Sequence, residues 1–169
     1  RRLFAVARWS VIASIASGAA WLVAQATVMS GMQAAQAMNR ETLGLVLGNT
    51  VFGHVWLLRL GLIVVLVAVL LAVRRSAGDP RRSRLAIVAA VIAAAYLGSL
   101  AWAGHAVAGA ELGDFEQIIA DVAHLLAAGA WLGALPALVG LLASTHAPDA
   151  VAQATRRYSN LGMASVCVL

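Results

Sequence analysis

The chain has 169 residues, of which 62% are hydrophobic and only 11% are charged. A soluble domain carries roughly 45–50% apolar and about 25% charged residues, and a disordered chain contains even fewer apolar residues. The composition therefore excludes both classes and indicates an integral membrane protein. The single cysteine, Cys167, excludes an internal disulfide framework and a metal site built from cysteines alone.

Runs of residues without Asp, Glu, Lys or Arg divide the chain into membrane spans. A helix rises about 1.5 Å per residue, so a bilayer core of about 30 Å requires about 20 apolar residues. The segments that meet this length are residues 4–29, 54–73, 85–105 and 121–142, and residues 158–169 form the start of a further span. We predict an all-α, polytopic transmembrane helix bundle, with four full spans plus the start of a fifth in one domain over residues 1–169. Because the chain starts with Arg1 and stops within an apolar segment, we expect it to be a fragment of a longer protein.

The charges of the connections alternate along the chain. All arginines except Arg40 and Arg59 fall at the start of the first span or in the second and fourth connections. The third connection, residues 106–120, is acidic and has no basic residue. Because arginine-rich loops remain in the cytoplasm, we predict a multi-pass membrane protein with the acidic loop in the periplasm or at the cell exterior. Topology explains the arginine clusters; lipid head-group or nucleic-acid binding is the alternative, and we expect the bilayer and no nucleic acid as partner.

Imidazole and thioether side chains gather at the outer ends of the predicted spans. They are His54, His105 and His124 on the second to fourth spans, and Met29 and Met32 at the end of the first. Thioethers select Cu(I) among the common metals, and imidazole also binds copper, so this pattern favours a site for copper as Cu(I). On the first, third and fourth spans, the spacing of neighbouring polar and aromatic residues predicts that these helix faces point into the bundle.

Two further polar residues belong to this region. Asp121 precedes His124 by one helical turn and can orient its ring by accepting the second N–H. Arg59 lies within the second span, where a charge is costly and marks a candidate functional or pathway residue. Snorkelling of Arg59 to the outer head groups is the alternative.

Four short motifs follow one another along the chain. They are the Met-x-Gly of residues 29–31, an aromatic-Gly-x-x-Trp-Leu-x-Arg pattern at 52–59, Gly-His-Ala at 104–106, and His-Leu-x-Ala-x-x-x-Trp-x-Gly at 124–133. Their order and spacing resemble the second to fifth spans of the bacterial copper resistance protein D (CopD/PcoD) family. The resemblance implies a copper-handling inner-membrane protein that works beside a periplasmic copper-binding protein of the CopC type. It also implies Met29, His54, His105 and His124 as candidate ligands.

We therefore predict a copper transport and copper resistance protein that binds copper at an outer His/Met site and passes it across the membrane. Two alternatives remain: a membrane electron-transfer protein that ligates haem b through the same histidines, and a docking subunit that binds no metal. The sequence contains no nucleophile elbow, phosphate-binding glycine loop or His-Glu-x-x-His motif. We therefore expect no enzymatic activity.

Overall fold

The computed structural model describes residues 2–103, 114–144 and 147–168, and every element in these ranges is helical. In chain order the elements are α1 (Arg2–Ser30), α2 (Ala34–Ala37), α3 (Arg40–Asn49), α4 (Val51–Arg75), α5 (Arg81–Gly98), the 3-10 helix η1 (Ser99–Ala103), α6 (Asp114–Leu142) and α7 (Pro148–Val168). Within the described ranges, four segments are long and apolar enough to cross a membrane, namely Phe4–Ser30, Val51–Arg75, Arg81–Trp102 and Phe115–Leu142. The prediction of an all-α transmembrane bundle is confirmed.

The last helix, α7, starts earlier in the chain than residue 158. It begins at Pro148, and proline is well tolerated in the first turn of a helix because that turn leaves its N–H groups without helical partners. Its first half carries the exposed Arg156 and Arg157. The apolar part after residue 158 therefore continues a helix whose beginning is polar.

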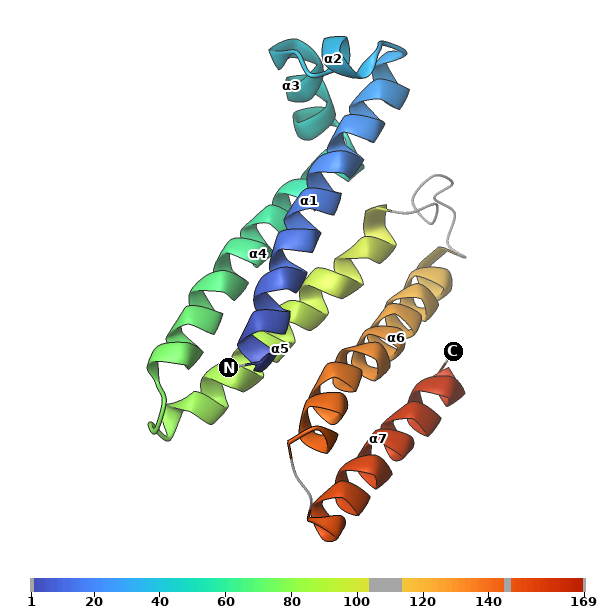
Figure 1. Ribbon diagram of the computed structural model, residues 1–169. Coiled ribbons are helices and arrows are strands. Elements are labelled where there is room, and N and C mark those ends of the chain that lie inside the picture. Colours follow the sequence, from blue (N-terminus) through green and yellow to red (C-terminus); the bar gives the residue numbers. More distant parts are fainter. Residues whose placement is uncertain (1, 104–113, 145–146, 169) are drawn as a thin grey trace.

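Consecutive long helices run up and down and pack as neighbours. α4 packs on α5, α5 on α6 and α6 on α7, while α1 contacts both α4 and α6. Figure 1 shows the α4–α5 and α6–α7 connections at the same end of the bundle, with α2 and α3 at the opposite end. The first of these ends carries the arginines of the last turn of α4 and the start of α5. We call it the arginine end and the other the capped end.

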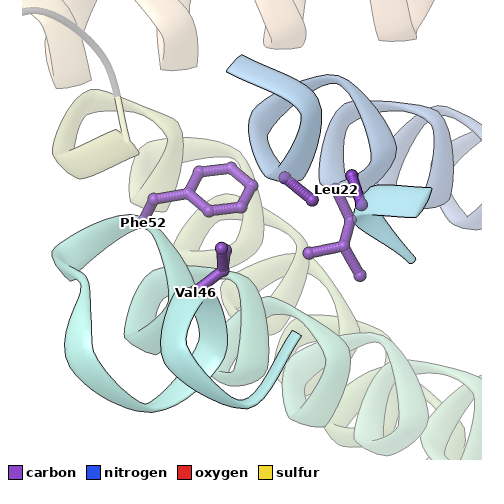
Figure 2. Packing of buried hydrophobic residues seen from close by; sticks show 5 residues of the cluster. Leu22, Val46 and Phe52 are labelled. Carbon is purple, nitrogen blue, oxygen red and sulfur yellow. The ribbon is translucent and has the colours of Figure 1, made fainter. Parts of the chain in front are cut away.

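The best-buried cluster of the protein lies at the capped end. Its members are Leu22, Ala26, Ala37, Val46 and Phe52, and they come from α1, α2, α3 and α4 (Figure 2). The Phe52 ring meets Trp21 edge to face, with ring centroids 5.0 Å apart and an interplanar angle of 77°. The short helices α2 and α3 therefore act as a cap that joins the end of α1 to the start of α4.

The cap is formed by local signals that our sequence analysis did not interpret. Gly31 ends α1 in a left-handed conformation with φ +67°, which glycine adopts without strain. The side chain of Asn39 then begins α3 by accepting a hydrogen bond of 2.8 Å from the N–H of Thr42. A tight turn and a capping residue thus convert the first connection into two helices.

Candidate functional site

His54 has a defined orientation in the first turn of α4. The hydroxyl of Thr50 caps this helix by accepting a hydrogen bond of 2.9 Å from the N–H of Gly53. A Cβ atom on Gly53 would collide with the backbone of α3, so this close approach of α3 and α4 requires glycine. The next residue, His54, places its Nε2 atom 3.0 Å from the carbonyl oxygen of Gly48.

This hydrogen bond determines which ring nitrogen of His54 can bind a ligand. A carbonyl oxygen only accepts hydrogen bonds, so Nε2 carries the proton and Nδ1 of the neutral ring keeps its lone pair. The side chain is exposed. Histidines that bind metals usually donate their other N–H to a carbonyl or carboxylate, which fixes the ring as it is fixed here. His54 is therefore oriented as a metal-binding histidine is.

Met29 and Met32 lie at the same end of the bundle as His54. Met29 is in the last turn of α1, one turn beyond the buried Ala26, and Met32 lies between α1 and α2. Their side chains are 49% and 44% exposed. Trp21, on the face of the first span that was predicted to point inward, packs on the buried cluster, whereas the two methionines at the end of that face are exposed.

His124 and its neighbour Asp121 lie on α6, a different helix from the one that carries His54. Both are exposed, contrary to the expected inward face, and they share no hydrogen bond among the described residues. α5 packs against both α4 and α6, the two helices that carry His54 and His124. His105 lies outside the described residues. Within residues 2–103, 114–144 and 147–168, no group of three or more His, Cys, Asp or Glu residues is positioned to hold a metal ion.

Arg59 is bound to the neighbouring helix. Its guanidinium donates hydrogen bonds of 2.8 Å to the carbonyl oxygen of Tyr96 and 3.1 Å to the hydroxyl of Ser99. The guanidinium carbon lies 4.1 Å from the centroid of the Tyr96 ring, within the range of a cation–π contact. Arg59 therefore joins α4 to the point where α5 changes into η1.

Residues 1–115 match the family described as copper resistance protein D-like, N-terminal domain. The chain belongs to the copper resistance protein D-like family. The resemblance recognised in the sequence is thereby confirmed, and the matched range includes Met29, His54 and Arg59 but ends before His124. No curated protein and no solved structure matches the chain.

Trp56 of this copper resistance protein D-like chain has a partner that our sequence analysis missed. Its indole N–H donates a hydrogen bond of 2.9 Å to the carbonyl oxygen of Gly18 on α1. In the sequence, only Gly18 itself could have indicated this contact, because a small residue lets a side chain of the facing helix reach the backbone. This bond holds α1 against α4 and so contributes to the positions of Met29 and His54.

The partners of Arg59 were also not identified from the sequence. Ser99 is buried, and its hydroxyl donates a hydrogen bond of 2.7 Å to the Tyr96 carbonyl oxygen that also accepts from Arg59. A serine within an apolar span was the only available sign, because the second acceptor is a main-chain atom. The arrangement positions α5 and η1 relative to α4.

Proposed function

We propose that this protein transports copper across the bacterial inner membrane, and that copper, as Cu(I), first binds at the capped end of the bundle. The observation that carries the proposal is the family match over residues 1–115, which contains Met29 and His54. The free Nδ1 of His54 and the exposed thioethers of Met29 and Met32 support it, because neutral imidazole and thioether ligands suit Cu(I).

The buried cluster brings these three residues to one end of the protein. Ala26 and Phe52 belong to that cluster, Met29 follows Ala26 by one turn, and His54 follows Phe52 by two residues. We therefore propose that Met29, Met32 and His54 capture copper first. His105 and His124 are proposed as later ligands.

Two polar residues are proposed to assist these ligands without binding copper. Asp121 lies one turn before His124 on α6 and would orient that ring once copper is bound. Arg59 already fixes α5 and η1, which precede residue 105 in the chain. We propose that it positions the histidine of that motif.

The proposed orientation places the arginine end in the cytoplasm and the capped end in the periplasm, following the bias of arginine toward cytoplasmic loops. Glu116 and Asp121 are exposed near the start of α6 and would raise the local concentration of cations. A periplasmic copper-binding protein of the CopC type is the proposed donor. Copper binding and passage require no covalent bond to be made or broken. We therefore propose a transporter and not an enzyme.

The orientation of His54 favours a small ion over haem. Its free nitrogen, Nδ1, is bonded to Cγ and is the ring nitrogen nearer to the backbone, where a flat macrocycle would meet the helix. Nε2, which is farther from the backbone, is occupied by the Gly48 carbonyl oxygen. A single copper ion reaches Nδ1 without this obstruction, so the haem alternative is the weaker candidate for this residue.

The deciding experiment measures copper and iron together by elemental analysis of the full-length protein purified after growth in copper. We expect copper near one equivalent or more and no iron. Stoichiometric iron would establish the haem alternative, and the absence of both metals would favour the docking subunit. Uptake of copper into vesicles that contain the protein then separates transport from binding alone.

Ligand variants test the site itself by titration of Cu(I) against a chromogenic chelator. We expect His54→Ala and the double variant Met29→Leu/Met32→Leu each to lower the affinity at least about tenfold, or about 1.4 kcal/mol. Met163→Leu is the matched control, because it removes a thioether that is 65% exposed on α7. An equal loss of affinity in the control would contradict a site at the capped end.

A further inference from the structure

A groove between α1 and α4 opens at the arginine end of the bundle, away from the proposed copper site. Its volume is about 690 Å³, within the range of roughly 300–1,000 Å³ that is usual for sites of small ligands. The walls are mainly apolar and include Phe4, Val11 and Ile12 from α1 and Val67, Leu70 and Leu71 from α4. A ligand with a long apolar part fits such a lining.

The groove is also lined by two arginines, Arg8 from α1 and Arg74 from the last turn of α4. Both side chains are exposed. Arg8 lies over the ring of Trp9, with its guanidinium carbon 5.4 Å from the ring centroid. Within the described part of the chain, no carboxylate pairs with either arginine. Two cations without a counter-charge therefore lie beside an apolar groove.

The helix packing accounts for the position of the groove. The buried cluster and the hydrogen bond from Trp56 to Gly18 hold α1 against α4 on the side of the capped end. Beyond that bond, toward the arginine end, the two helices leave the space that Phe4 and Leu71 line. In a bilayer, lipid chains are the apolar molecules available to fill a groove between membrane helices.

We propose that this groove binds an anionic phospholipid. One acyl chain lies between α1 and α4, and the phosphate lies between Arg8 and Arg74. The charge complementarity supports this occupant, since basic pockets between transmembrane helices at a membrane surface bind anionic head groups. A bound lipid would join the two helices where their own packing is open, and this role does not depend on copper.

The test uses the full-length protein in mild detergent with equal amounts of phosphatidylglycerol and phosphatidylcholine, and counts retained lipids by native mass spectrometry. We expect the wild-type protein to retain phosphatidylglycerol about tenfold over phosphatidylcholine, a difference of about 1.4 kcal/mol. We expect Arg8→Gln/Arg74→Gln to lose this preference. Equal retention of the two lipids by the wild-type protein would overturn the proposal.

The matched control is Arg156→Gln/Arg157→Gln, which removes the same charge from exposed positions of α7 outside the groove. It should retain phosphatidylglycerol as the wild-type protein does. An equal loss in both double variants would show diffuse attraction to surface charge instead of a site. Displacement of the lipid by millimolar inorganic phosphate would show that the arginines bind phosphate without the acyl chain, which also overturns the proposal.

A second variant tests the apolar part of the groove and leaves both arginines in place. Leu71→Trp adds bulk to a side chain that is 44% exposed on the groove wall, and we expect it to reduce retention of phosphatidylglycerol. Leu71→Cys, in a Cys167→Ser background, should react with a lipid-soluble maleimide and be protected by phosphatidylglycerol. Failure to react would show that another part of the protein fills the groove.

Discussion

The guanidinium of Arg59 makes two contacts with one residue, Tyr96. It donates a hydrogen bond to the main-chain carbonyl oxygen and lies over the face of the ring. The hydrogen bond measures 2.8 Å and the guanidinium carbon lies 4.1 Å from the ring centroid. With the hydroxyl of Ser99 as a second acceptor, the charge is stabilised without a carboxylate in the described part of the chain. An arginine inside a span is therefore a link between α4 and α5.

Replacing Arg59 should loosen this link. We expect Arg59→Gln to lower stability by about 1.5–3 kcal/mol, the range for hydrogen bonds to charged groups. Arg59→Lys should recover only part of this loss, because an ammonium group lacks the planar face that stacks on Tyr96. Thermal unfolding in detergent, followed by circular dichroism, measures the effect. Arg84→Gln, exposed on α5, is the control, and an equal shift there would contradict the role of Arg59.

The close contact of α3 with α4 should make position 53 intolerant of any side chain. Gly53→Ala would drive a methyl group into the backbone of α3, and we expect a loss of about 1–3 kcal/mol together with weaker Cu(I) binding through His54. Gly61→Ala on the same helix has open space and should be neutral or stabilising by up to about 1 kcal/mol. If the two variants behaved alike in unfolding and Cu(I) titration, the contact would be absent in the protein.

A comparable pair of glycines tests the packing of α6 on α5. A Cβ atom on Gly129 would collide with the side chain of Leu97, whereas Gly133 has open space around it. Because a leucine side chain can move partly aside, we expect Gly129→Ala to cost about 1–2 kcal/mol, and Gly133→Ala to cost nothing measurable. Thermal unfolding of the two variants, and of Gly129→Ala/Leu97→Ala, checks this. If the double variant were no more stable than Gly129→Ala, the added methyl group would be colliding with a residue other than Leu97.

The orientation of the bundle is tested by thiol labelling in intact cells. In a Cys167→Ser background, we expect a cysteine introduced as Gln36→Cys in α2 to react with a membrane-impermeant maleimide from outside. Ala77→Cys, in the connection between α4 and α5, should react only after the cells are opened. Both positions are exposed. The reverse labelling would invert the proposed direction of copper entry.

The membrane helices could be predicted because their signal lies in long apolar runs. Leu, Val and Ala fill the stretches that become α1, α4, α5 and α6, and arginines mark the adjoining ends of α4 and α5. The cap could not be predicted in the same way. Its most deeply buried members are Ala26 and Ala37, and alanines in α2 carry no periodic pattern that distinguishes a four-residue helix from a loop.

The candidate site was predictable in composition but not in geometry. Residue types alone singled out His54 and Arg59, yet each of them binds a main-chain oxygen, of Gly48 and Tyr96 respectively, that no side-chain pattern reveals. The exposure of Met29 depends on which face of α1 the cap covers. That choice is made by tertiary packing, which helical spacing in one segment does not encode.

The separation of 37 residues between Arg59 and Tyr96 bears on how the chain enters the membrane during synthesis. At about 5–20 residues per second, Tyr96 follows Arg59 out of the ribosome roughly 2–7 s later. During that interval α4 lies in the bilayer without Tyr96 as a partner for its guanidinium, at a cost of up to about 2.5–3.5 kcal/mol, the insertion-scale value for the centre of a helix. An 18-residue stretch of α4 has a mean hydropathy of 2.8, against 1.6 to 2.1 for such stretches of the other three spans. The span that carries Arg59 is thus the most hydrophobic of the four. This hydrophobicity favours the insertion of α4 before Tyr96 has been synthesised.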